Sequence, residues 1–149
     1  GIKDSEIERG YNEMLRIANS TFNGKGKDIH ILEHGEASCL GLSKILAERG
    51  MRNVVAIDER TTRLLVERPE NLKSIFEDRM NTKVTIRGGN LKFFRDFRII
   101  RSPELAYVAY KKNLVGLKDG KVLDALLYAL KFKGAAISGD EIEQIKRIG

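Results

Sequence analysis

The stretch from residue 29 to residue 57 constrains the fold most, because two short apolar runs typical of strands flank one longer run typical of a helix. The run "IHIL" (29–32) reads as a short strand, and Gly35 then breaks the pattern. A helix is predicted from about Glu36 to Arg49, with Cys39, Leu42, Ile45 and Leu46 facing inward. The continuous apolar run "NVVAI" (53–57) is typical of a strand that is buried on both faces of a parallel sheet.

Strands and helices continue to alternate along the rest of the chain. Further helices are predicted over 4–21, 61–67, from 69 onward, 102–114, 121–133 and 138–149, and further strands over 97–100 and on both sides of the Gly-Gly turn at 88–89. Ser102 is the expected N-cap of one helix, and Ser138 and Glu141 have capping-box spacing at another. The alternation predicts an α/β fold class: a three-layer α/β/α arrangement with a mainly parallel central sheet.

Length and composition restrict the class of protein. A chain of 149 residues is most economically one domain (1–149), and its single cysteine cannot form an internal disulfide. No apolar run approaches the roughly 20 residues that span a membrane, which predicts a soluble, cytoplasmic protein without a membrane partner. The net charge of +6 favours anionic partners, nucleic acid first, although a lysine-rich surface can also serve only solubility and ion-pair networks.

Two acidic residues lie where a strand is expected to give way to a helix. Glu36 follows the run at 29–32, and Asp58 follows the run at 53–57. Ligands of open α/β sheets collect at the carboxyl ends of the strands, so the two carboxylates are candidates for one Mg²⁺ or Mn²⁺ site. The alternative is structural: Glu36 is a charge that complements a helix N-terminus, and Asp58 caps the helix over 61–67.

These residues resemble a known family. "HGEASCLGLSKILAERG" (34–50) followed by "NVVAIDERTTRLLV" (53–66) is similar to the middle of PIN-like proteins, especially a small archaeal and bacterial group described as predicted nucleic-acid-binding proteins. The shared pattern is Gly-Glu-Ala opening a helix and then Asp-x-Arg ending a strand, with another arginine soon after. The Gly-x-x-Ile-Ser segment at 134–138 also resembles that group.

The resemblance implies a compact α/β/α domain that is often a homodimer. In many members of the family this domain cleaves RNA with a divalent metal held by acids, and in some it is the toxin partnered by an antitoxin. Carried over by residue, the resemblance makes Glu36 and Asp58 catalytic acids that ligate the metal directly or support it through water, while Arg60 and Arg63 match without an assigned role. PIN-like chains open with a strand that bears an Asp, whereas residues 1–15 read as a helix, so one principal ligand is missing from the pattern.

The segment 68–96 is longer than the link that the family has at this place and is interpreted as a basic insertion. Its cations, together with Arg60 and Arg63, are candidates for contacts with nucleic-acid phosphates, and its phenylalanines for stacking on bases. The alternative is that the phenylalanines dock the insertion onto the domain. The candidate cations are Lys83, Arg87 and Lys92, and the phenylalanines are Phe76, Phe93 and Phe94.

The sequence therefore predicts a PIN-like nucleic-acid-binding domain that acts as a metal-dependent ribonuclease. RNA is the expected substrate, with DNA as the other possibility. The alternative is a non-catalytic RNA-binding or protein-interaction module with an incomplete acidic site.

Overall fold

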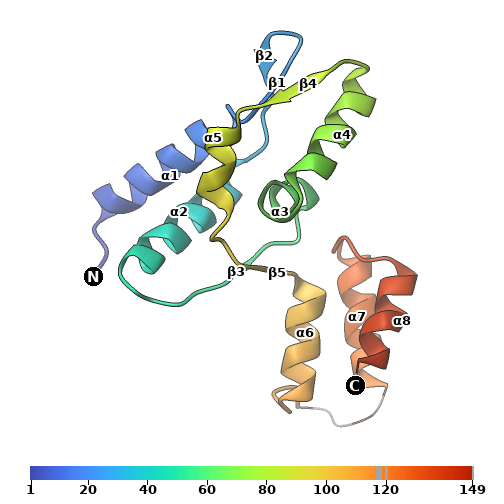
Figure 1. Ribbon diagram of the computed structural model, residues 1–149. Helices are drawn as coiled ribbons and strands as arrows, with labels where there is room; N and C mark the ends of the chain where they lie inside the picture. Colours follow the sequence, from blue (N-terminus) through green and yellow to red (C-terminus); the bar gives the residue numbers. More distant parts are fainter. Residues whose placement is uncertain (117–118, 120, 149) are drawn as a thin grey trace. The chain divides into compact units, whose positions relative to one another are not determined.

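The computed structural model describes residues 1–116, 119 and 121–148 and divides the chain into two compact units (Figure 1). Unit 1 comprises residues 1–55 and 60–99, and unit 2 comprises residues 56–59 and 100–149. The chain passes between the units at three points: two lie within the short strands β3 (Val55–Ala56) and β5 (Ile99–Ile100), and the third lies between Glu59 and Arg60. None of the described helices is long and apolar enough to cross a membrane.

Unit 1 is built from helices around a small sheet. Its elements are α1 (Asp4–Ala18), β1 (Phe22–Gly24), β2 (Lys27–Asp28), α2 (His34–Glu48), α3 (Arg60–Glu67), α4 (Pro69–Met80), β4 (Val84–Ile86), α5 (Gly88–Leu91) and the 3-10 helix η1 (Lys92–Phe94). Unit 2 contains α6 (Ser102–Lys111), α7 (Val122–Phe132) and α8 (Gly139–Arg147). Gly149, the last residue of the helix predicted over 138–149, lies outside the described residues.

The predicted three-layer α/β/α fold with a mainly parallel sheet is wrong. In the described part of the chain, one sheet has three antiparallel strands in the order β2-β1-β4, and the other pairs only the two short strands β3 and β5 in parallel. The run 29–32 forms no strand, because the backbone N–H groups of Ile31 and Leu32 both donate to the Asn19 side-chain oxygen, at 2.6 and 2.8 Å. The run 53–57 contains only the two residues of β3, and Val54 is 54% exposed.

Helix α2 was predicted correctly as an element, but the inward face assigned to it was partly wrong. Cys39 and Leu42 are exposed, whereas Ala37, Leu40 and Gly41 are buried together with Ile45, which was predicted to face inward. The face is set by helix α1, which lies beside α2 and contacts it through Gly10 and Gly41 (Figure 1). A hydrophobic pattern alone does not reveal which of several apolar stripes meets a glycine of another helix.

The segment 68–96 packs into unit 1. Strand β4 pairs with β1 in the register Phe22 to Ile86 and Gly24 to Val84, and the Phe76 ring meets the Phe22 ring edge-on at 5.5 Å between centroids. The second strand predicted after the Gly-Gly turn is wrong, because α5 and η1 follow instead. Asn90 of α5 anchors this segment by donating to the Ile17 carbonyl and the Ser20 hydroxyl, at 3.2 and 3.1 Å.

Unit 2 has a core of its own, formed by side chains of α7, α8 and the link between them. The buried residues are Leu123, Leu127, Ile137, Ile142 and Ile145. The predicted capping box at the start of α8 is confirmed: the Glu141 backbone N–H donates to the Ser138 hydroxyl at 3.1 Å, and the Ser138 N–H donates to the Glu141 carboxylate at 2.8 Å. Ser102 is the first residue of α6, whose N-cap is Arg101, so the predicted N-cap was one residue late.

Candidate nucleic-acid interface

Asp58, the acid that follows the 53–57 run, binds the first residue of α6. One carboxylate oxygen accepts a hydrogen bond from the Ser102 backbone N–H at 2.7 Å, and the other accepts from the Ser102 hydroxyl at 2.6 Å. Both residues belong to unit 2. Asp58 therefore satisfies a free N–H group of the first turn of α6, a helix other than the one over 61–67 that was predicted for its structural role.

Glu36 lies in the first turn of α2 in unit 1 and is half-buried. Its Oε2 atom has no hydrogen-bond partner among the described residues. Within that part of the chain, no three His, Cys, Asp or Glu side chains are grouped so as to hold a metal ion. The carboxylate oxygens of Asp58 already accept hydrogen bonds from Ser102, and the Mg²⁺ or Mn²⁺ site predicted for Glu36 and Asp58 stays a prediction.

The two arginines taken from the family pattern differ in their surroundings. Arg60 is exposed at the first position of α3. The Arg63 side chain is only 16% exposed, and its Nε lies 3.8 Å from the Glu67 carboxylate one turn later. Arg63 is therefore largely packed within unit 1, and only Arg60 is well placed to meet a ligand from solvent.

Arg87 is held by the fold. Its guanidinium donates to the Ser20 carbonyl and ion-pairs with Asp28, whose oxygens lie 2.9 and 3.1 Å from Nη2 and Nη1. Hydrogen bonds to Asp28, first from the Asn23 amide and then from Arg87, lower the pKa of that carboxyl. This two-point pairing connects the end of β4 to the β1–β2 hairpin, so much of the Arg87 charge is already compensated.

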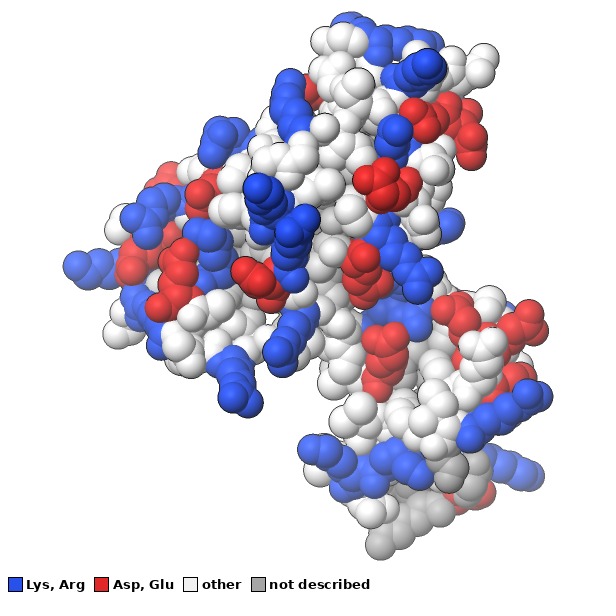
Figure 2. Space-filling view, viewed as in Figure 1, with Lys and Arg blue, Asp and Glu red and all other residues white. Residues whose placement is uncertain are grey.

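Lys83 and Lys92 are exposed, and neither has an ion-pair partner among the described residues. Lys83 precedes β4, and Lys92 is the first residue of η1. Arg95 and Arg98, which follow η1, are also exposed and lack an acidic partner within the same part of the chain. On the face in view, cations interleave with acids and do not form one continuous patch (Figure 2).

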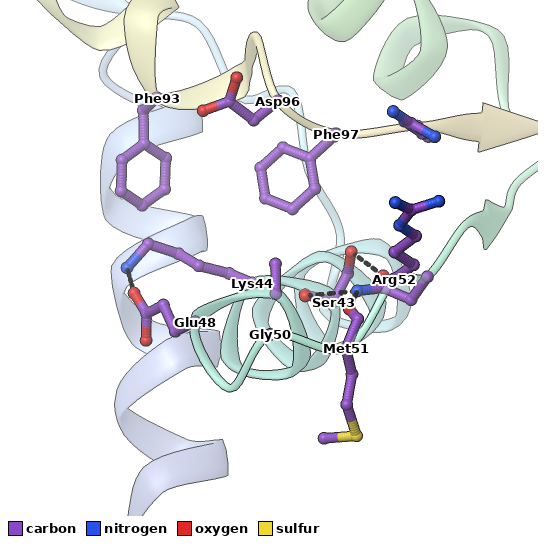
Figure 3. Close-up of a pocket in the computed structure, with 12 residues that line it drawn as sticks. Ser43, Lys44, Glu48, Gly50, Met51, Arg52, Phe93, Asp96 and Phe97 are labelled. Carbon is purple, nitrogen blue, oxygen red and sulfur yellow. Dashed lines mark hydrogen bonds and ion pairs between the residues drawn. The ribbon is translucent and has the colours of Figure 1, made fainter.

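In unit 1, residues of the segment 93–98 and of the C-terminal end of α2 line a cleft of about 510 Å³. Figure 3 shows the rings of Phe93 and Phe97 pointing toward the side of the cavity where Lys44, Ser43 and Arg52 lie, while the Asp96 carboxylate points away. We call this cavity the η1 cleft. Its lining residues are Ser43, Lys44, Ala47, Glu48, Gly50, Met51, Arg52, Asn53, Phe93, Asp96, Phe97 and Arg98.

The cations of the η1 cleft are not equivalent. Lys44 pairs with Glu48 at 2.7 Å and with Glu13 at 3.3 Å, and the hydrogen bond that Lys44 donates to Glu48 is the main cause that raises the Lys44 pKa. Its ammonium also lies 5.1 Å from the centroid of the Phe93 ring. Arg52 and Arg98, by contrast, have no ion-pair partner among the residues that the structure describes.

Sequence reasoning found part of this site and missed the rest. It selected Phe93 but omitted Phe97 and the two arginines of the cleft, and the selected Lys92 does not line the cleft. The available signal was the stretch "KFFRDFR" (92–98), in which aromatic and basic residues alternate closely. Arg52 carried no local signal, because only the packing of α2 against the later segment places it beside Phe97.

Comparison of the chain with models of protein families, with curated proteins and with solved structures found no match in any of the three.

Proposed function

We propose that this protein binds single-stranded nucleic acid, RNA first, through the cations of unit 1 that follow α4. The observation that carries the proposal is the absence of acidic partners, among the described residues, for Lys83, Lys92, Arg95 and Arg98. The backbones of β4, η1 and β5 hold these four residues along one segment, in which Asp96 is the acidic residue.

Cations without acidic partners are the ones that phosphates neutralise. A protein that pairs lysines and arginines with phosphates releases the counterions condensed on the nucleic acid, and its affinity then falls as salt concentration rises. The net charge of +6 acts in the same direction. Arg87, which Asp28 already neutralises, contributes less than its place in the basic segment suggests.

The ribonuclease activity expected from the resemblance to PIN-like proteins stays a prediction. The hydrogen bonds from Ser102 to Asp58 give that carboxylate a structural task, so the proposal assigns binding and no catalytic step. The predicted homodimer and antitoxin partner likewise stay predictions.

The test is fluorescence anisotropy with a labelled single-stranded RNA of 12 nucleotides, measured between 50 and 200 mM salt. The variant is the triple change Lys83→Gln, Lys92→Gln and Arg95→Gln. Its matched control removes three exposed lysines of unit 2, by Lys111→Gln, Lys112→Gln and Lys133→Gln. We expect the first variant to lose at least tenfold in affinity. The slope of log K against log salt, which is negative, should become shallower by about 2.

Equal losses in the two triple variants would mean that net charge, and not this surface, governs binding, and would overturn the proposal. Absence of salt-sensitive RNA binding would also overturn it. A parallel reaction with Mn²⁺ follows RNA cleavage by wild type and Asp58→Asn. Cleavage that requires Asp58 would support the ribonuclease prediction and contradict the purely structural role assigned to that residue here.

A further inference from the structure

We propose that the η1 cleft is a pocket for one nucleotide, in which the base stacks on Phe97 while its phosphate pairs with Arg52 and Arg98. This inference rests on the proposed binding of single-stranded nucleic acid and names the unit of ligand that one part of the surface takes. The charge of this cleft resembles that of the rest of the basic surface. The inference gives the cleft a role of its own, which is to bind a base.

The η1 cleft contains an aromatic ring with one open face. Phe94 is 1% exposed and anchors the segment, and the Phe97 ring lies against it with 6.2 Å between centroids. Phe97 itself is only half-buried and lines the cleft. A ring that is fixed on one side and open on the other is a suitable platform for a nucleobase, whose flat face stacks on aromatic side chains. Phe93 is less suitable, because the Lys44 ammonium already lies against its ring.

The cations that line the η1 cleft differ in how far acids neutralise them. Glu48 and Glu13 hold the Lys44 ammonium, so Lys44 adds little net attraction for an anion. Arg52 and Arg98 are the lining cations without an acidic partner in the described part of the chain. The Arg98 backbone carbonyl accepts from the Val55 N–H at 2.9 Å, which fixes Arg98 beside the chain that follows Arg52. Guanidinium groups match the geometry of phosphate oxygens.

The size and the polar lining of the η1 cleft suit a nucleotide of any base. A volume of about 510 Å³ lies in the range of about 300 to 1,000 Å³ that is usual for small-ligand sites. The polar groups beside Arg52 are already satisfied: the Ser43 hydroxyl donates to the Asn53 side-chain oxygen at 2.5 Å, and the Asn53 amide donates to the Ser43 and Met51 carbonyls at 3.1 Å. Because these groups do not require a partner from the ligand, the pocket should accept purines and pyrimidines alike.

The experiment titrates the isotope-labelled protein with UMP, AMP, uridine and inorganic phosphate and follows backbone amide signals by NMR. We expect UMP and AMP to shift signals of residues 50–53 and 93–98 with affinities within about threefold of each other. Uridine and phosphate should each bind at least tenfold more weakly. Phosphate that binds as tightly as UMP would reveal an anion site without base stacking and would overturn the inference.

Two variants test the assigned contacts. Phe97→Leu should weaken UMP binding about tenfold, whereas Phe132→Leu, at a residue of unit 2 that is 85% exposed, should leave it unchanged. Arg52→Gln should weaken UMP binding, whereas Arg79→Gln, an exposed change on α4, should not. Far-UV circular dichroism checks that each variant is folded. The NMR signals that shift in the wild-type protein test the position of the site without any variant.

The outcomes separate this inference from the proposed function. If the RNA of 12 nucleotides binds but UMP and AMP shift no signals around the cleft, the nucleotide pocket is wrong and the binding function stands. If neither RNA nor mononucleotides bind, both proposals are wrong.

Discussion

Gly41 of α2 lies directly against Gly10 of α1. A Cβ atom built on Gly41 would be 2.8 Å from the Gly10 carbonyl carbon and 2.8 Å from the Tyr11 backbone nitrogen, closer than real Cβ atoms approach other atoms. The backbones of the two helices can approach this closely only because neither residue carries a side chain. This contact sets the inward face of α2 and, through the end of that helix, one wall of the η1 cleft.

Gly41→Ala should therefore destabilise the protein by about 1 to 3 kcal/mol, the usual cost of overpacking a well-packed site. The added methyl group meets backbone atoms, so no side-chain rotation can relieve the clash. Urea unfolding followed by far-UV circular dichroism measures the change. Gly35→Ala is the matched control in the same helix: it meets no atom within 4 Å, so it should cost nothing or stabilise slightly. Equal effects of the two changes would contradict the role of the contact.

Asp58→Ala should destabilise unit 2 by about 1 to 2 kcal/mol, because it leaves an N–H group at the start of α6 without its acceptor. Asp58→Asn should cost less, since the asparagine side-chain oxygen still accepts one of the two hydrogen bonds. A double-mutant cycle with Ser102→Ala, measured by urea unfolding, isolates the hydrogen bond from the Ser102 hydroxyl, because the backbone N–H remains in that variant. A cost near zero for Asp58→Ala in the Ser102→Ala background would show that the backbone hydrogen bond does not stabilise the helix.

The stability of unit 2 should fall in acid partly through Glu141. The hydrogen bond from the Ser138 backbone, followed by the one from Arg101, lowers the Glu141 pKa below its ordinary value of 4.5. A carboxyl whose pKa is lower in the folded state stabilises the fold above about pH 4.5, and this stabilisation is lost as the pH falls through the folded pKa. Glu141→Gln should therefore cost less than about 1 kcal/mol near pH 7 and progressively less below pH 4.5. Urea midpoints of wild type and variant between pH 3 and pH 7 check this, and a difference that is constant with pH would contradict it.

Arg87→Gln should raise the pKa of Asp28 toward 3.8, because it removes one of the two groups that hydrogen-bond to the carboxylate. The hydrogen bond from Asn23, the larger cause, remains, so the shift should be incomplete. NMR titration of the Asp28 carboxyl carbon measures it, with Arg79→Gln as the control. The same variant should change RNA affinity by less than Lys92→Gln does. A larger loss at Arg87 would mean that its pairing with Asp28 gives way to phosphate.

Local signals in the sequence predicted several helix boundaries. Pro69 marks the start of α4, and the Ser138 and Glu141 pair marks the start of α8; both features act within one turn of the helix that they begin. The N-cap of α6 was placed one residue late: the N-cap is Arg101, whose backbone N–H donates to Glu104, while Ser102 donates to Asp58, 44 residues earlier in the chain. An acceptor supplied by a distant segment cannot be predicted from the sequence of the helix.

The sheets could not be read in the same way. Residues 29–32 are apolar enough for a strand, yet the Asn19 side chain takes the backbone hydrogen bonds that a neighbouring strand would have received. The strands that do pair include the stretch from Phe22 to Gly24, which has little β-branched character and finds one of its two partners, β4, some 60 residues later. The η1 cleft has the same origin, since Arg52 and Phe97 meet only through tertiary packing.

The pairing of Asp58 with Ser102 also has a temporal consequence. During synthesis, residues 56–59 leave the ribosome together with unit 1 but belong to unit 2, and all of the second segment of unit 1, 60–99, follows before Ser102 emerges. Domains generally fold in the order in which they are made. We therefore expect nascent chains released at residue 99 to fold unit 1. Residues 56–59 of such chains should lack their contacts with unit 2, because residues 100–149 have not yet been synthesised.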